Sequence, residues 1–128
     1  LTIEVGELLD VSAEIEVGAA EEIVLSVRGA RIAYDAKAGL AQFEKSAAPA
    51  RRPDGRIAIR VLLDRTSVEV FVNGGLATIT QFFVAPPDCR TVEVTATGPK
   101  AVLKELAVRE LRSVWAPPAN QTPGVPAE

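Results

Sequence analysis

The stretch LLDRTSVEVFVNGG, residues 62–75, decides the fold class. Apolar and polar residues alternate in it with the period of two that marks a β-strand with one buried face. The buried face would consist of Val68, Val70 and Val72. Asn73-Gly74 then favours a tight hairpin, because a type I′ turn needs positive φ at two successive residues. The stretch therefore predicts a β-hairpin with a return strand over Leu76–Val84.

Short apolar runs with strand periodicity occur along the rest of the chain, separated by glycine and proline. The pattern predicts an all-β protein, either an antiparallel sandwich or a barrel. Residues 101–111 also fit a helical face, but their surroundings favour a strand with an irregularity. Residues 46–55 contain two prolines and are expected to form an exposed loop. The other predicted strands cover residues 8–17, 23–27, 30–34, the surroundings of Phe43, 57–63 and 91–96.

Length and patterning indicate a single domain over residues 1–115. The segment 116–128 is rich in proline and has little to bury, so we expect it to be disordered or to lie along the surface. The chain does not begin with methionine, which suggests that it is a fragment of a longer protein.

Composition argues against several classes of partner. The net charge is -3, and lysine and arginine are scattered singly, so no basic stripe for nucleic acid is expected. No apolar run is long enough to span a membrane. The chain has no histidine and a single cysteine, Cys89, so it lacks the usual zinc and copper ligand sets, and we expect no metal or cofactor.

Several carboxylates are candidates for a glycosidase pair, because hydrolysis of a glycosidic bond needs two. Asp10, Glu14 and Glu16 alternate with apolar residues and are interpreted as the solvated face of an edge strand. For Asp64 and Glu69, the neighbouring Arg65 would lower a carboxyl pKa, whereas a general acid needs a raised one. For Asp64 and Glu69 we therefore favour a structural or binding role over catalysis.

The outward face of the central strand has a composition that suits a polar ligand. It presents a guanidinium, a hydroxyl and a carboxylate at Arg65, Ser67 and Glu69, with Asp64 adjacent. These groups could hydrogen-bond a sugar. The alternative is an Arg65–Glu69 ion pair that stabilises the strand or docks a neighbouring domain, and ion pairs of this kind are common.

Two aromatic residues are further candidates. Tyr34, followed by Asp35, is interpreted either as a strand end with a turn or as the wall of a ligand pocket. Trp115 follows the last predicted strand and is interpreted either as a plug closing one end of the core or as a stacking surface. With one Trp, one Tyr and four Phe, a flat platform of stacked rings is not expected.

The segment IRVLLDRTSVEVFVNGG, followed by ATIT and by SVW, resembles the signature of the C-terminal β-sandwich of glycoside hydrolase family 32, the levanases, inulinases and invertases. The resemblance covers about residues 8–115 and implies a two-sheet antiparallel β-sandwich of the jelly-roll or concanavalin-like type. Asp64, Arg65 and Glu69 match charged positions of the signature. Thr66 replaces the usual serine.

In that family the chemistry lies in an N-terminal β-propeller with Trp-x-Asn-Asp-Pro-Asn, Arg-Asp-Pro and Glu-Cys motifs, and this sequence contains none of the three. The resemblance thus implies a non-catalytic accessory domain of a fructan-degrading enzyme, located outside the cell or in the periplasm. The similar family 66 carbohydrate-binding modules imply binding of terminal fructose units of levan or inulin. The alternatives are a purely structural domain that packs on the propeller, and an unrelated lectin-like adhesion module.

Overall fold

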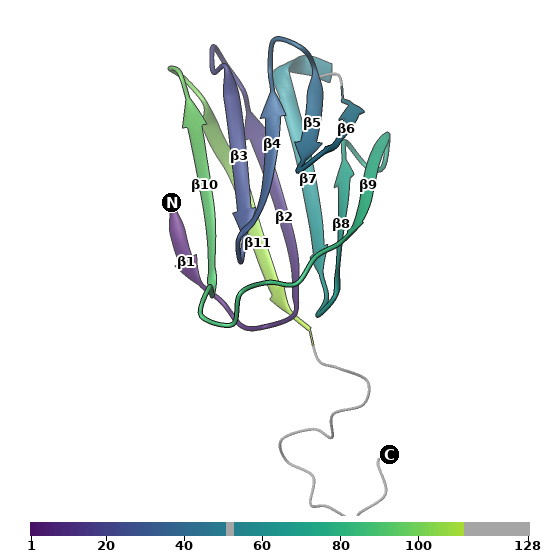
Figure 1. Ribbon diagram of the computed structural model, residues 1–128. Coiled ribbons are helices and arrows are strands. Elements are labelled where there is room, and N and C mark those ends of the chain that lie inside the picture. The colour runs from purple at the N-terminus through teal and green to yellow at the C-terminus, as the bar shows by residue number, and fades with distance from the viewer. Residues whose placement is uncertain (51–52, 112–128) are drawn as a thin grey trace, which may run out of the picture.

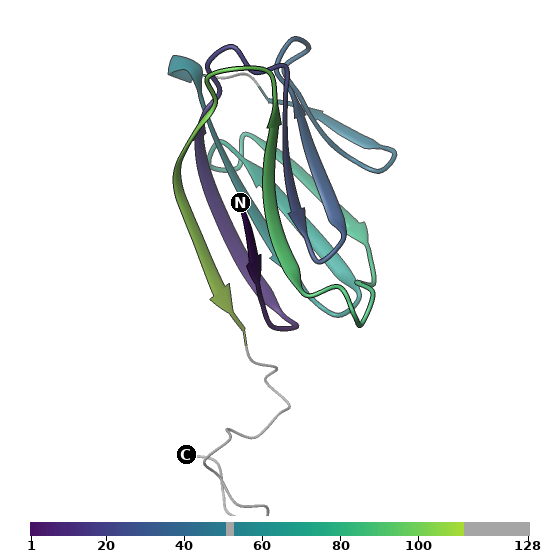
Figure 2. The ribbon, with the colours of Figure 1, turned by 90° about the vertical axis from the view of Figure 1, so that its left-hand side faces the viewer.

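The computed structural model describes residues 1–50 and 53–111 of the chain. They form two antiparallel sheets packed face to face (Figures 1 and 2), as the sequence and the resemblance predict. The six-stranded sheet has the order β1-β10-β3-β4-β5-β6 and the five-stranded sheet the order β11-β2-β7-β8-β9. The bounds are β1 Thr2–Glu4, β2 Leu9–Glu16, β3 Glu22–Val27, β4 Ala30–Asp35, β5 Leu40–Phe43, β6 Ser46–Pro49, η1 Pro53–Gly55, β7 Arg56–Leu63, β8 Ser67–Val72, β9 Ala77–Phe82, β10 Thr91–Thr97 and β11 Val102–Glu110.

The core lies between the sheets and is built by strand alternation. On β8 the inward residues are Val68, Val70 and Val72, and each is fully buried, as predicted. The opposing sheet contributes Tyr34 and Phe43, the two largest buried side chains. Full burial of one Val, Leu or Ile side chain stabilises the fold by about 1.5–3 kcal/mol, so the alternating pattern fixes which face of each strand turns inward.

The predicted strands are confirmed, with differences at two connections. Residues 46–49 form β6, an edge strand paired with β5, where a fully exposed loop was expected. An edge position tolerates Pro49 because its missing N–H interrupts the ladder on one side only. The hairpin between β8 and β9 is present, but its loop covers residues 73–76, since Val72 pairs with Ala77. It is longer than a two-residue type I′ turn.

The last strand resolves the ambiguity of residues 101–111 in favour of β-structure. β11 pairs with β2, and its register shifts between Leu103 and Glu105, which is the predicted irregularity. The shift lets Leu103 and Leu106 both pack against the core although their spacing breaks the period of two.

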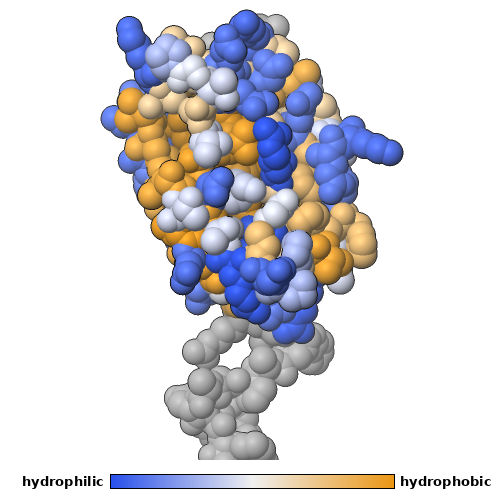
Figure 3. Space-filling model, turned by 60° about the vertical axis from the view of Figure 1, so that its left-hand side comes forward, coloured by the Kyte–Doolittle hydropathy of each residue, from blue (hydrophilic) through white to orange (hydrophobic). Residues whose placement is uncertain are grey.

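The two long sides of the sandwich differ. On one side β6 and β9 meet, and Ser46 Oγ donates a hydrogen bond to Gln81 Oε1 at 2.9 Å. The rings of Phe43 and Phe83 are in edge-to-face contact on this side, with 5.6 Å between their centroids. On the other side β10 and β11 lie apart (Figure 2). Figure 3 shows apolar side chains at the surface of this side of the molecule. A hollow of about 180 Å³ on this side is lined by residues that include Val94 and Leu103.

A buried arginine that the sequence did not reveal fastens the loops at one end. Arg28, at the β3–β4 turn, is 5% exposed and has a φ of 46°. Its guanidinium donates to the carbonyl oxygens of Glu7, Pro86 and Cys89 at 2.8, 3.2 and 2.8 Å. The β1–β2 and β9–β10 connections are thereby joined to the β3–β4 turn.

Candidate functional site

The outer face of the five-stranded sheet carries charged and polar side chains around one hollow. Register places Ser12 of β2 beside Arg60 of β7, and Arg60 beside Phe71 of β8. In the next row Glu14 lies beside Ala58. Small side chains at Ser12 and Ala58 thus form a floor between larger neighbours.

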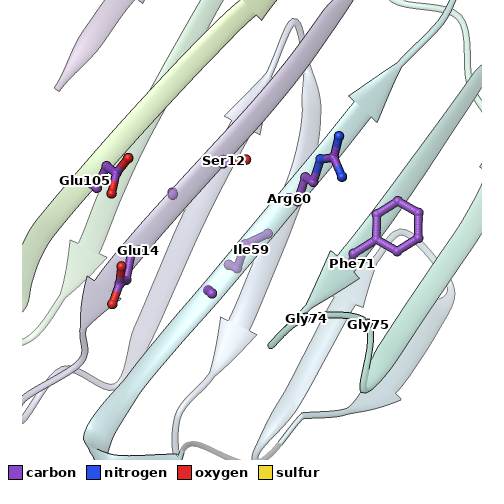
Figure 4. Close-up of a pocket in the computed structure, with 10 residues that line it drawn as sticks. Ser12, Glu14, Ile59, Arg60, Phe71, Gly74, Gly75 and Glu105 are labelled. Atoms are coloured by element: carbon purple, nitrogen blue, oxygen red, sulfur yellow. The ribbon is translucent and has the colours of Figure 1, made fainter.

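A hollow of about 400 Å³ lies over this floor (Figure 4). Its volume is within the range of about 300–1,000 Å³ that is usual for small-molecule sites. Figure 4 shows Arg60 and Phe71 on adjacent strands, with Glu14 and Glu105 toward the opposite edge of the sheet. The lining consists of Ser12, Ala13, Glu14, Ala58, Ile59, Arg60, Phe71, Gly74, Gly75 and Glu105.

An ion pair with Asp10 fixes the orientation of Arg60, which lines this hollow. Arg60 donates from Nε to Asp10 Oδ1 at 3.0 Å and from Nη2 to Asp10 Oδ2 at 2.8 Å. Asp10 is only 8% exposed. The hydrogen bonds from Arg60 lower the pKa of Asp10 despite its burial, and Arg109 contributes a further attraction. Asp10 therefore stays ionised and holds Arg60 in one orientation.

The chemistry that this arrangement allows is binding rather than acid catalysis. A lowered pKa makes Asp10 an acceptor and unsuitable as a general acid. Arg60 keeps Nη1, for which the described part of the chain supplies no hydrogen-bond partner, and its side chain is 53% exposed. A second hollow of about 360 Å³ continues the surface toward β11, and the residues that line it are Asp10, Ser12, Arg60, Ala107 and Arg109.

The loop at the end of the hairpin forms one wall of the hollow. Asn73 N–H donates to the Ala58 carbonyl at 2.7 Å, and Ala58 N–H donates to Asn73 Oδ1 at 3.0 Å. Asn73, Gly74 and Gly75 all have positive φ, of 51°, 72° and 95°. Asparagine and glycine tolerate this conformation, so the Asn-Gly-Gly sequence both turns the chain and positions the wall.

Asp64 and Arg65, predicted as ligand-binding residues, lie in the bend between β7 and β8. Asp64 Oδ1 accepts the N–H of Arg65 at 2.7 Å, and Asp64 N–H donates to the Ser67 carbonyl at 2.9 Å. Arg65 Nε contacts Glu7 Oε1 at 3.2 Å, with both side chains about half exposed. The proposed Arg65–Glu69 pair is thus wrong: within the described residues the ion-pair partner of Arg65 is Glu7.

Ser67 and Glu69 lie on the outward face of β8, as predicted, and both are half-buried. Glu69 is flanked by Leu62 on β7 and Thr80 on β9. It is therefore on the same face as the hollow, two residues along β8 from Phe71. The structure places Ser67 and Glu69 on the same sheet face as the hollow, although neither residue lines it, and it leaves Asp64 and Arg65 in the bend at the end of that face.

The two aromatic candidates do not join this surface. Tyr34 is 1% exposed and belongs to the core of the other sheet, so the pocket-wall interpretation is wrong. The turn after it is confirmed, because Asp35 Oδ1 accepts the N–H groups of Lys37 and Ala38, both at 3.0 Å. Trp115 lies outside the described residues.

The interpretation of Asp10, Glu14 and Glu16 as the solvated face of an edge strand needs correction. β2 is an inner strand between β11 and β7, and Asp10 is buried against Arg60. Alternation had shown that these side chains face outward, and Glu14 and Glu16 do contact Arg56, at 3.6 and 3.2 Å. The partnership of Asp10 with Arg60, 50 residues away, has no local signal.

Residues 1–50 and 53–111 form neither a cluster of metal ligands nor a membrane-spanning helix. These residues contain no group of three or more cysteine, aspartate or glutamate side chains placed to hold a metal ion. They also contain no helix with the length and apolar character needed to cross a bilayer.

Comparison with curated proteins finds a levanase from Bacillus subtilis (strain 168) that is 32% identical over 71 residues. The match covers 56% of this chain and 10% of that levanase, so the chain spans about a tenth of the relative's length.

Solved structures share the fold. The exo-inulinase from Aspergillus awamori aligns with a TM-score of 0.66 at 20% identity, over 84% of this chain and 25% of that one. The carbohydrate-binding module CBM66 from Bacillus subtilis aligns with a TM-score of 0.65 at 13% identity, over 86% of this chain and 78% of the module. At these identities the alignments establish the fold alone.

The family comparison covers most of the chain. The model of the family described as "Glycosyl hydrolases family 32 C terminal" matches residues 4–110, which include all of the outer-face residues discussed above. A match of this extent excludes the alternative that the signature in residues 62–75 is accidental. The chain therefore belongs to the family of C-terminal domains of family 32 glycosyl hydrolases.

Proposed function

We propose that the chain is the non-catalytic accessory domain of a fructan-active glycoside hydrolase, and that the hollow over Ala58 binds a fructosyl unit of levan or inulin. The observation that carries the proposal is the grouping of a fixed guanidinium, an aromatic ring and carboxylates around one hollow, at Arg60, Phe71, Glu14 and Glu105. The similarity to a levanase, an exo-inulinase and a carbohydrate-binding module supports the choice of ligand.

Each group has a role suited to a polyhydroxylated ligand. Arg60 Nη1 and the carboxylates donate to and accept from vicinal hydroxyls, and charged partners give the stronger hydrogen bonds. The ring of Phe71 packs against the C–H face of the sugar. Because Asp10 already holds Arg60 in place, little side-chain entropy is lost when a sugar binds.

Calorimetric titration of the chain with fructose, levan and inulin tests this function. Phe71→Ala removes the ring without disturbing an ion pair, and we expect affinity to fall about tenfold, the equivalent of roughly 1.4 kcal/mol of ring contact. Val24→Ala is the matched control, since Val24 is a half-buried apolar residue on the outer face of the opposite sheet. Absence of heat with all three sugars would refute sugar binding.

A further variant separates the hollow from the charged signature residues. Glu69 is two positions from Phe71 along β8, so we expect Glu69→Ala to weaken binding less than Phe71→Ala does. Loss of binding on Glu69→Ala with no effect of Phe71→Ala would move the site from the hollow to the residues beside the bend.

A second candidate function is docking against a catalytic domain, and a separate apolar surface favours it. Phe82 is 74% exposed and Val84 is 57% exposed, and they lie two residues apart at the end of β9. Large exposed apolar side chains in proximity often mark interfaces. A family 32 catalytic domain expressed separately should associate with the chain and lose affinity on Phe82→Asp. No association in sedimentation would contradict docking and leave the sugar proposal unaffected.

The localisation follows from the same proposal. An accessory domain that binds fructan polymers acts where such polymers are present, so we place it outside the cell or in the periplasm. Nucleic acid and membrane lipid are not partners in this proposal.

A further inference from the structure

We propose that two copies of this chain associate through β11, so that their five-stranded sheets join into one continuous sheet. The inference concerns the open edge of the sheet and does not rest on the proposed function, although Glu105 also lines the hollow. It is carried by the exposure of this edge, by the direction of its backbone groups and by the order of charges along it.

β11 differs from the other three sheet edges in the described part of the chain. β1 has three residues and β6 has four, with a proline at its end. The edge of β9 faces β6, to which it is tied through Gln81 and Ser46. β11 extends over nine residues, and Figure 2 shows it at the border of its sheet. Long, uncovered edges present unpaired backbone groups that another strand can bind.

The backbone groups available at this edge can be assigned from the register. Leu111 N–H donates to the Leu8 carbonyl at 2.8 Å, which makes residue 111 a hydrogen-bonded partner of the β2 side. In an antiparallel ladder such pairs alternate along the strand. The N–H and C=O groups of Leu106 and Val108 therefore point away from β2, toward the open edge.

Charges along β11 select one way of pairing two copies. In a two-fold antiparallel arrangement centred on Ala107, Glu105 lies opposite Arg109 of the second copy, and the reverse pair repeats the contact. All three of these residues face outward from the sandwich, beside the outward residues of β2. Opposite charges placed directly across strands are stabilising.

The arrangement centred on Ala107 also provides hydrogen-bond partners for the free backbone groups of β11. It places Leu106 opposite Val108 of the second copy, so the residues whose N–H and C=O groups are free to pair meet each other. Leu106 and Val108 are half-buried and pack against the core, and a second strand would cover the rest of their surface.

Two-fold arrangements centred on the other residues between 105 and 109 do not place the opposite charges of Glu105 and Arg109 across from each other. Centring on Leu106 or Val108 places Ala107 opposite one of the charges. Centring on Glu105 or Arg109 brings two like charges together, which is destabilising. The sequence between residues 105 and 109 is thus self-complementary in one register.

Sedimentation velocity without sugar, from about 10 μM to about 1 mM, tests the inference, because an interface of one strand pair lies at the small, weak end of specific interfaces. We expect reversible dimers in the upper part of this range. Glu105→Arg and Arg109→Glu should each weaken the dimer at least tenfold, since each places like charges opposite one another. The control is Lys45→Glu, which reverses the charge of an exposed side chain just after β5, on the other side of the sandwich.

Rescue experiments decide the register. An equimolar mixture of Glu105→Arg and Arg109→Glu chains should form heterodimers, because each charge then meets its opposite. The chain carrying both substitutions should dimerise on its own, with circular dichroism confirming its fold. A wild-type chain that stays monomeric to the highest concentration would overturn the inference. So would a dimer that tolerates both single reversals, or single variants that fail to associate when mixed.

Discussion

Replacement of Asp10 by asparagine tests the central ion pair of the outer face. Asp10 accepts two hydrogen bonds from Arg60, and its side chain is 10% exposed. Asparagine keeps one acceptor oxygen but turns an amide N–H₂ toward one guanidinium donor. Since a hydrogen bond to a charged group contributes about 1.5–3 kcal/mol, we expect the free energy of unfolding at pH 7 to fall by about 2 kcal/mol.

The pH dependence of stability is a second, independent test of the Asp10–Arg60 ion pair. Arg60 lowers the pKa of Asp10 in the folded chain below its unfolded value. The stabilisation is therefore complete above the unfolded pKa of about 3.9 and is lost as the pH falls through the lower folded pKa. The difference in stability between wild type and Asp10→Asn should be constant from neutral pH to about pH 5 and should shrink below about pH 4.

Urea unfolding followed by far-UV circular dichroism measures this difference. A loss of about 2 kcal/mol corresponds to a shift of about 1 M in the urea midpoint, for a slope typical of a small domain. Asp88→Asn, an exposed aspartate in the loop before Cys89, is the matched control and should shift stability by less than about 0.5 kcal/mol. Equal midpoints at pH 7, or a difference that persists undiminished at about pH 2, would refute the reasoning.

Three further substitutions test the packing, each by urea unfolding. Val70→Ala opens a cavity at a fully buried position and should cost about 2 kcal/mol. Gly18→Ala should cost at least about 2 kcal/mol, because φ is 58° and a Cβ would lie 2.3 Å from the Lys100 carbonyl oxygen. Arg28→Met leaves three carbonyl groups without their donor and should cost about 3 kcal/mol. A change below about 0.5 kcal/mol would contradict the contact concerned.

The sequence predicted the strands well because alternation is a local signal. Val68, Val70 and Val72 are inward, and the strand at residues 101–111 carries the expected irregularity. The loop predicted for residues 46–49 is wrong because composition alone suits a loop there, and only pairing with β5 makes these residues a strand. An edge strand of this kind is stabilised by its neighbour rather than by its own residues.

The site was predicted less completely, because it depends on which strands are neighbours. Alternation placed Ser67 and Glu69 on the outward face correctly. It could not place Asp10 beside Arg60, because that contact needs the order β2-β7 within the sheet. The same limit explains Arg65, which contacts Glu7 at the β1–β2 connection and not the nearby Glu69.

The hollow exists because the strand register brings small side chains on adjacent strands next to one another. Ala58 and Ser12 are unremarkable in sequence, yet their alignment between Arg60 and Glu14 leaves the space that a ligand can fill. A signal was present in Asn73-Gly74-Gly75, whose loop forms the wall, but it was interpreted only as a turn.

The central claim, that the hollow over Ala58 binds a fructosyl unit, is tested most directly by nuclear magnetic resonance. The measurement is a titration of the ¹⁵N-labelled chain with a levan-derived oligosaccharide, followed through the backbone amide shifts. We predict saturable shifts concentrated at Ser12, Ala58, Arg60, Phe71 and Gly74, which surround the hollow. Shifts confined to the bend at Asp64 and Arg65 or to the six-stranded sheet, or no shifts at all, would contradict the claim.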